Sequence, residues 1–439
     1  MDDSERSGEG PEGDAAAQGE APDGGPQPRA ATPHPRRRRL LLALGAVAAV
    51  VAVWLAFSLG PALTAPGTDP LDARVAEWAR SNGMSFVVDT LEQVQYALFP
   101  PRVGGTVAGG IPEASPVVGA LAPGDSGSPS ASSAPAPSGP PQSPGPNVAS
   151  SASPSLGPSA SPTPLPAPDP IQPMVSPPLP GEGVWKTLAL LHGQPAIRVA
   201  YLRPDAQHTS YLVAVAWMDQ SLVQLVLHPG FQLPGGSGWS EPDDVPVSQR
   251  DALLATFNSG FRLADANGGY WQGGKTAAPL RTGAASMVFY KDGRLDVVRW
   301  SPEMLGPDVV AVRQSLILLV DNGAITPEVT SDSQASWGLT FTGAASVWRT
   351  AIGIRADGSL VFVCGPAMSV RTLAEIVQAA GAVRAMQLDI NYSWTNFMTY
   401  THPSHGVAVP HMINSDAVPN PYRYLYPSSR DFVAVLARP

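Results

Sequence analysis

The stretch from Trp348 to Trp394 constrains the fold of this chain more than any other. It reads WRTAIGIRADGSLVFVCGPAMSVRTLAEIVQAAGAVRAMQLDINYSW. Two strand patterns joined by Asp357-Gly358 predict a β-hairpin, because these two residue types accept the positive φ of a tight turn. An amphipathic helix follows, and then a strand whose polar side ends at Asp389. A carboxylate in that position suits an active site.

The helix after the hairpin begins after Ser369. Thr372 and Glu375 have the spacing of a capping box at its start. Gly381 should end it, because glycine readily adopts the left-handed conformation that follows a last turn. The apolar residues at helical intervals predict one buried face made of Leu373, Ile376, Val377 and Ala380.

Short turn sequences divide the rest of the region 184–439 into strands. Asp292-Gly293 and Asn322-Gly323 each lie between two strand patterns and predict two more hairpins. The runs YLVAVAWMD and SLVQLVLHPG add further strands. We therefore expect an α+β fold, with an antiparallel-rich mixed β-sheet domain and a few helices.

Proline and glycine are unevenly spread along the chain. Residues 1–35 and 104–183 are about a quarter of the chain but hold 27 of the 49 prolines and 18 of the 43 glycines, so the part that can bury a core is smaller than 439 residues. We expect a disordered cytoplasmic tail over 1–39 and a disordered Pro/Ser/Ala/Gly-rich linker over 104–183. Fully extended, such a linker reaches on the order of 200 Å.

Four arginines, Arg36 to Arg39, precede Leu40–Leu59, which are twenty residues without a charge. This run is long enough to cross a hydrocarbon core of about 30 Å as a helix. It predicts a single transmembrane helix over 40–62, with the arginines in the cytoplasm and the C-terminal domain (184–439) outside the cell membrane. A cleaved signal peptide is the alternative, against which the 39-residue leader argues. Residues 63–103 form a juxtamembrane helical segment with no predicted role.

Several features limit the possible partners. The formal charge of −9 gives no basis for binding nucleic acid. GYWQGGKT (269–276) has the letters of a P-loop, but Pro279 and Gly283 follow where a helix is required, so we expect no nucleotide. His402, His405 and His411 fit no standard zinc spacing, and we expect no metal or cofactor. The single cysteine, Cys364, excludes an internal disulfide and should be buried.

Three segments together resemble the phosphodiester glycosidase family. They are RTAIG (349–353) with the hairpin, helix and Leu388-Asp389 after it; FNSGF (257–261), similar to the family's Asn-Gly-Gly-Phe-Phe; and SLILLVDNGAI, upstream of RTAIG. The resemblance covers roughly residues 184–439. It implies a hydrolase that cuts the bond between a sugar's anomeric carbon and a phosphodiester oxygen. Because the predicted anchor and linker place the domain outside the cytoplasm, cell-envelope glycopolymers are candidate substrates.

A site for such a reaction needs a cation for the phosphate and a proton donor or acceptor. Arg349 is the expected cation, since a guanidinium can grip two oxygens, and Asp389 is the expected general acid or base. The alternatives are a structural ion pair for Arg349 and a strand-end role for Asp389. The expected substrate-binding residues are Asn258, Gly260, Thr350, Asn391, Ser393 and Arg281. A second carboxylate is normally needed, and Asp265 and Asp416 are both open candidates.

The segment after Asp389 departs from the family pattern. The family has Gly-Gly-Gly-Ser there, whereas this chain has Ile390, Asn391, Tyr392 and Ser393. Glycines allow backbone N–H groups to approach an anion closely. The loop must therefore have another shape, and the alternative reading is a non-catalytic envelope-glycan binder or a wall-tethering domain.

Overall fold

The structure is a computed structural model that describes residues 35–114, 116–118, 163–330, 337, 346–414 and 420–439. Most of the predicted N-terminal tail and the centre of the predicted linker lie outside the described residues. Contacts divide the chain into two units, residues 1–60 and 61–439.

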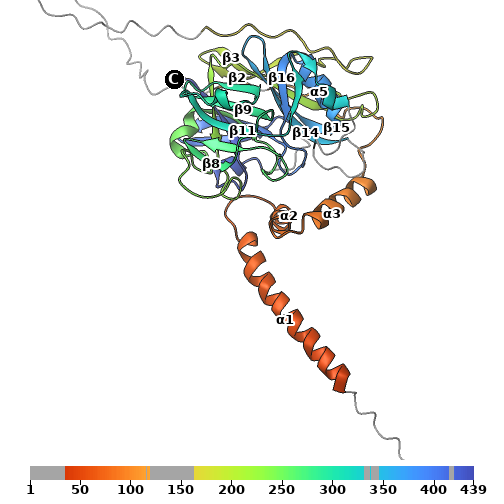
Figure 1. The fold of residues 1–439 in the computed structure, drawn as a ribbon. Coiled ribbons are helices and arrows are strands. Elements are labelled where there is room, and N and C mark those ends of the chain that lie inside the picture. The colour runs from red at the N-terminus through yellow and green to blue at the C-terminus, as the bar shows by residue number, and fades with distance from the viewer. Residues whose placement is uncertain (1–34, 115, 119–162, 331–336, 338–345, 415–419) are drawn as a thin grey trace, which may run out of the picture. The chain divides into compact units, whose positions relative to one another are not determined.

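Helix α1 spans Pro35–Leu63 (Figure 1). Within it, the 22 residues Leu42–Leu63 have a mean hydropathy of 2.4, which makes the helix long and apolar enough to cross a membrane. This agrees with the predicted anchor in position and length.

The described strands form three sheets, of nine, five and five strands. The first has the order β1 (Val117–Val118), β2 (Lys186–Leu191), β3 (Gln194–Leu202), β4 (Val213–Met218), β15 (Leu360–Met368), β14 (Val347–Arg355), β16 (Ala382–Gln387), β12 (Leu318–Asp321) and β13 (Ala324–Ile325). The second runs β10 (Leu295–Arg299), β9 (Ala285–Tyr290), β11 (Val309–Gln314), β7 (Tyr270–Gln272) and β8 (Lys275–Ala278). The third runs β18 (Val407–Met412), β17 (Phe397–Ser404), β6 (Leu253–Asn258), β19 (Phe432–Ala437) and β5 (Val223–His228).

Neighbouring strands pair antiparallel in all three sheets, except that β1 pairs parallel to β2. The remaining helices are α2 (Leu71–Ser81), α3 (Ser85–Leu98), α4 (Pro327–Thr330) and α5 (Val370–Ala379). Short 3₁₀ turns cover Val247–Ala252, Pro302–Met304 and Arg423–Leu425. The predicted α+β, antiparallel-rich fold is confirmed.

The three predicted turns all join hairpin strands. Asp292-Gly293 connects β9 to β10, Asn322-Gly323 connects β12 to β13, and Asp357-Gly358 connects β14 to β15. The second residue of each turn has a positive φ, and Asn322 has one as well, at 50°. The local chemistry of these dipeptides therefore sets the strand order across large parts of two sheets.

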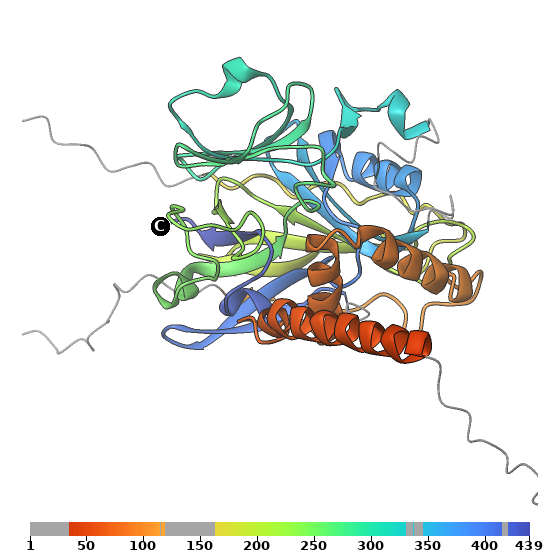
Figure 2. The same cartoon turned by 60° about the horizontal axis from the view of Figure 1, so that its bottom comes forward.

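Helix α5 lies over the strands of the largest sheet and buries its predicted apolar face (Figure 2). The predicted capping box is wrong. Ser369 is the N-cap, and its Oγ accepts a hydrogen bond of 2.9 Å from the backbone N–H of Thr372. Glu375 instead pairs with Arg371 one turn earlier, at 2.8 Å. Gly381 follows the helix with φ of 91°, as predicted.

An aromatic cluster joins the first and third sheets. The ring centroid of Phe257 on β6 lies 4.8 Å from that of Phe362 on β15, and Phe397 on β17 lies 5.3 Å from Phe362. All three rings are buried. Because β6 ends just after Phe257, this packing holds the end of β6 against the first sheet, where the candidate site lies.

Two sequence features have plain structural explanations. GYWQGGKT forms the β7–β8 hairpin, so no helix follows its threonine. Cys364 lies in β15 with its side chain fully buried, and burial raises the pKa of its thiol. Both segments are strands of the core sheets.

The described ends of the predicted linker pack on the domain. Ile171 and Val175 are buried. Glu182 accepts a 2.8 Å hydrogen bond from Arg203 Nη2, with both side chains buried. Near the other end, the backbone N–H of Gly104 donates to Gln207 at 2.6 Å. The limits 104 and 183 stay a prediction, and the contacts begin inside them.

A buried ion pair holds the last strand to the second sheet. Arg313 Nε on β11 lies 2.6 Å from Asp431 Oδ2, just before β19, and both side chains are about fully buried. Arg313 also donates to the backbone carbonyls of Gln314 and Phe261. Through its bond to the carbonyl of Phe261, Arg313 also holds the end of the FNSGF segment.

Replacing Asp431→Asn should lower the free energy of unfolding by about 3 kcal/mol, because it leaves a buried guanidinium without its counter-charge. Urea denaturation of the full chain measures this. Asp308→Asn is the matched control: Asp308 pairs with Lys291 at 4.0 Å in an exposed position, so its loss should cost about 0.5 kcal/mol or less. Equal effects of the two substitutions would contradict the role of the buried pair.

Candidate functional site

Asp389 lies two residues past the end of β16 and is 4 % exposed. Its Oδ1 accepts hydrogen bonds from the backbone N–H groups of Ile390 at 2.7 Å and Asn391 at 3.0 Å. Its Oδ2 accepts a bond of 3.0 Å from Arg430 Nη2. Although nearly buried, the carboxylate lines a cavity of about 380 Å³.

The environment of Asp389 favours its protonated form. Burial raises the pKa of this carboxyl group, and the nearby charge of Glu77 raises it further. The guanidinium of Arg430 and the two backbone N–H groups oppose the shift, but the net direction is upward. An upward shift of the pKa is the direction that suits a carboxyl group to act as a general acid.

Thr350 and Asn258 hold the backbone of Asp389 in place. The N–H of Asp389 donates to Thr350 Oγ1 at 3.1 Å, and the N–H of Thr350 donates to the carbonyl of Asp389 at 2.9 Å. Asn258 Nδ2 donates to the same Thr350 oxygen at 2.9 Å. Asn258, Thr350 and Asp389 thus converge from three distant chain segments, but Asn258 and Thr350 are not among the described residues that line the cavity.

Arg349 lies in a different part of the site. Its Nε donates to the carbonyl of Met368 at 2.8 Å and its Nη1 to Gln387 Oε1 at 3.0 Å. It is 2 % exposed, and it is not among the described residues that line the cavity. These contacts support the structural alternative weighed for Arg349; a role in phosphate binding stays a prediction.

Arg430 is the cation that the structure places beside Asp389. Its Nη1 pairs with Glu77 at 3.2 Å, and its Nη2 reaches the carbonyl of Gly260 at 3.4 Å. Sequence reasoning missed this residue, because SSRDF carries no motif and precedes the last strand. Its position follows from β19 pairing with β6, which brings residue 430 beside the FNSGF loop.

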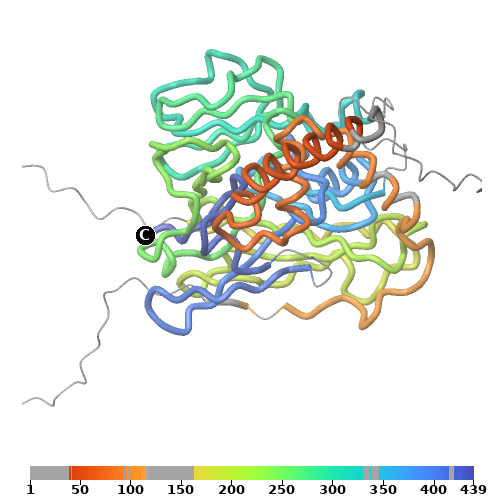
Figure 3. Tube along the Cα trace, turned by 90° about the horizontal axis from the view of Figure 1, so that it is seen from below, coloured from red at the N-terminus to blue at the C-terminus, as the bar shows by residue number. Residues whose placement is uncertain are grey.

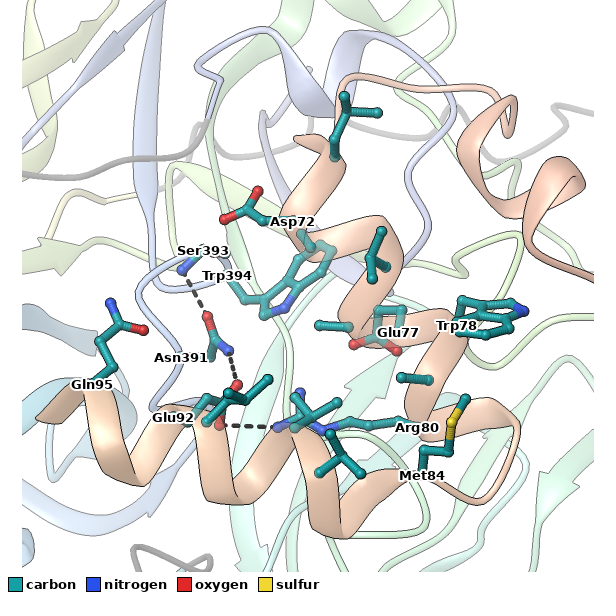
Figure 4. Close-up of a pocket in the computed structure, with 18 of the residues that line it drawn as sticks. Asp72, Glu77, Trp78, Arg80, Met84, Glu92, Gln95, Asn391, Ser393 and Trp394 are labelled. Carbon is teal, nitrogen blue, oxygen red and sulfur yellow. Dashed lines mark hydrogen bonds and ion pairs between the residues drawn. The ribbon is translucent and has the colours of Figure 1, made fainter. Parts of the chain in front are cut away.

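Helices α2 and α3 supply residues to the lining of this cavity; their orange trace lies on the side of the domain that faces the viewer in Figure 3. Glu77 of α2 is 6 % exposed and pairs with both Arg430 and Arg262, the latter at 3.3 Å. Glu92 of α3 accepts a 3.2 Å hydrogen bond from Asn391 and pairs with Arg80 at 2.9 Å (Figure 4). The juxtamembrane segment, which had no predicted role, therefore supplies walls of the site.

The cavity beside Asp389 combines cations and carboxylates. Its charged lining residues are Arg80, Arg262, Arg430, Asp89, Glu92, Asp265 and Asp389. Asp265, one of the two candidate second carboxylates, is thus in the same cavity as Asp389. The other, Asp416, lies outside the described residues. Across the described part of the chain, no group of three or more His, Cys, Asp or Glu side chains is arranged to hold a metal ion.

The remaining predicted residues are spread over the site and beyond it. Gly260 has no room for a side chain, since an added Cβ would lie 2.9 Å from the Cβ of Ser315. Asn391 lines the cavity. Ser393 is buried, and its carbonyl accepts a 2.6 Å bond from Arg423. Arg281 is exposed, donates to Asn267, and is not among the cavity's described lining residues.

The loop after Asp389 folds without the left-handed conformations that a glycine run permits, since none of residues 390–394 has a positive φ. The N–H groups of Ile390 and Asn391 donate to Asp389, and that of Ser393 donates to Asn391 Oδ1 at 2.9 Å. These amides are already used inside the loop. An anion in the cavity would therefore meet arginine side chains first.

Comparison with known proteins agrees with the sequence motifs. Residues 252–412 match the family model described as phosphodiester glycosidase. No curated protein matches the chain.

Among solved structures, the zebrafish N-acetylglucosamine-1-phosphodiester alpha-N-acetylglucosaminidase catalytic domain, auto-inhibited by its pro-peptide, is 16 % identical, with a TM-score of 0.37 over 56 % of this chain and 85 % of that one. A hypothetical protein from Synechocystis is 12 % identical, with a TM-score of 0.31 over 56 % and 63 %. An exported protein from Burkholderia pseudomallei is 12 % identical, with a TM-score of 0.26 over 52 % and 74 %. With the family match and the motifs together, this chain carries a domain of the phosphodiester glycosidase family.

Proposed function

We propose that this protein is a membrane-anchored hydrolase that cleaves the glycosidic bond of sugar-1-phosphodiesters outside the cytoplasm. The family domain supports a hydrolase role. The observation that carries the proposal is the pairing of Asp389 with Arg430 at 3.0 Å on the wall of a cavity of about 380 Å³. An acid and a cation this close together can act on one phosphodiester, the acid on the bridging oxygen and the cation on the non-bridging oxygens.

The charged residues of the cavity can be assigned separate roles in the proposed reaction. Arg430 and Arg262 hold the phosphate, since guanidinium groups bind its oxygens in pairs. Water adds to the anomeric carbon as the bond from that carbon to the phosphodiester oxygen breaks, which releases the sugar and a phosphomonoester. Asp389 donates a proton to the leaving oxygen. Asp265 is the proposed second carboxylate, which accepts a proton from the attacking water.

The alternative is a glycan-binding domain without turnover. It is favoured by the loop after Asp389, which lacks glycines and uses its own amides internally. Each cavity arginine also already faces a carboxylate, so a substrate has to displace these pairs. Binding and turnover must therefore be measured separately.

The proposed location follows from α1. With the span Leu42–Leu63 in the cell membrane and the arginines before it in the cytoplasm, the residues after it lie outside. Sugar phosphates of cell-envelope glycopolymers are then the substrates within reach.

Asp389→Asn should lower kcat by at least about 100-fold, because it removes the proton donor while keeping the shape of the side chain. The assay incubates the full chain with methyl diesters of several sugar 1-phosphates and measures free sugar. Near-ultraviolet circular dichroism checks that the variant is folded, and Asp308→Asn serves as an exposed Asp-to-Asn control. Saturable binding without release of sugar by the unmodified chain would favour the glycan-binding alternative.

Glu77→Gln should shift the high-pH decline of kcat, which reflects the ionisation of Asp389, to lower pH. The charge of Glu77 raises the pKa of Asp389, so its removal lets Asp389 ionise earlier as pH increases. If Asp389 acts as the acid, activity then declines at a lower pH than in the unmodified chain. The measurement is kcat against pH, with the exposed Glu375→Gln as control. A limb that stays in place or moves upward would show that Asp389 is not the titrating group.

A further inference from the structure

A second cavity, of about 610 Å³, lies between α2, α3 and residues 391–394 (Figure 4). Much of its wall consists of apolar side chains from the two helices, among them Ala76, Ala79, Met84, Val87, Val88 and Leu91. Its volume is within the range of about 300–1,000 Å³ that is typical of pockets for small ligands. The cavity is therefore large enough for a chain of many carbon atoms.

This apolar cavity adjoins the charged cavity of the candidate site. Arg80, Glu92, Asn391 and Trp394 line both of them. In Figure 4, Asn391 and Glu92 lie at this shared wall, joined by their hydrogen bond. A ligand with an anionic head at Asp389 and Arg430 can thus extend an apolar tail between the helices without leaving the protein.

Helix α2 is hydrogen-bonded to the short segment that leads into it. Arg74 of α2 donates to the backbone carbonyls of Leu63, the last residue of α1, at 3.0 Å and of Gly67 at 2.9 Å. Helices α2 and α3 and the residue after them also expose large apolar side chains to solvent. Leu71, Phe86, Leu91, Leu98 and Phe99 are each more than 60 % exposed. Apolar side chains next to a membrane span are suited to the interfacial layer of a bilayer.

We propose that the aglycone of the substrate is an apolar chain, alkyl or isoprenoid, and that it binds in the cavity between α2 and α3. This inference rests on the proposed hydrolase function, whose sugar phosphodiester head occupies the adjoining cavity. The substrate is then an amphiphile held at the membrane, and the juxtamembrane helices are its binding site. Hydrolysis breaks the bond from the anomeric carbon to oxygen, and water supplies the hydroxyl group of the free sugar and a proton. The other product is a phosphomonoester that keeps the apolar chain.

The test compares the dissociation constants of n-hexyl phosphate and methyl phosphate, which contain the phosphate and the chain but no sugar. The full chain is used in lipid nanodiscs with isothermal titration calorimetry. Each buried methylene contributes about 0.8 kcal/mol, which corresponds to about a fourfold change in affinity. The hexyl ester should bind at least about tenfold more tightly than the methyl ester.

Two variants locate this preference. Ala76→Phe fills part of the cavity, and Leu91→Gln makes its wall polar at an exposed position that the fold tolerates. Both should reduce the preference to about twofold or less. Ala206→Phe, at an exposed alanine outside both cavities, should retain it.

A preference below about twofold in the unmodified chain overturns the inference. So does a full preference that persists in both Ala76→Phe and Leu91→Gln, since the ester would then be partitioning into the lipid. Release of sugar from methyl diesters is measured separately. Turnover without a preference for the hexyl ester would contradict the apolar aglycone and would still support the hydrolase. A preference for the hexyl ester without any turnover would contradict the hydrolase and would support an amphiphile-binding site.

Discussion

The guanidinium of Arg430 is the interaction on which the candidate site depends. It lies between the carboxylates of Asp389 and Glu77, at 3.0 and 3.2 Å, and all three side chains are nearly buried. A buried charge is tolerated only when it is paired. Arg430 therefore connects helix α2 to the loop after β16, and through its own backbone it connects both to the last strand. Removing Arg430 would leave Asp389 and Glu77 without the guanidinium that they share.

Around this triad, the sheets act as a rigid frame. Thr350 on β14 fixes the backbone of Asp389 through hydrogen bonds of 2.9 and 3.1 Å, and Asn258 at the end of β6 donates to the Thr350 hydroxyl at 2.9 Å. The aromatic cluster between the sheets and the Arg313–Asp431 pair hold β6 and the FNSGF loop in register. The candidate site thus combines a wall from the sheets with a wall from α2 and α3, the helices that follow α1 in the chain. This arrangement connects the proposed chemistry to the proposed amphiphilic substrate.

Much of the fold could be predicted because the information was local. Asp-Gly and Asn-Gly dipeptides predicted three hairpins, and Gly381 predicted the end of α5, since positive φ is a property of single residues. The start of α5 after Ser369 was also predicted, but its cap was not: the Oγ of Ser369 accepts the N–H of Thr372, in place of a capping box between Thr372 and Glu375. Arg349 shows the same limit. Its motif marked an important position, but not whether the guanidinium turns toward the cavity or, as observed, toward Met368 and Gln387.

The sequence by itself determined the strand-rich fold class, the apolar span, the family resemblance and the position of Asp389 at the end of a strand. These depend on residue type, periodicity and short spacing. Only the tertiary structure decided which charges surround that carboxylate. Arg430 is 41 residues from Asp389 along the chain, and Glu77 is 353 residues from Arg430. Pairing over such separations is set by strand order and by the docking of α2 and α3, neither of which leaves a periodic pattern in the amino-acid sequence.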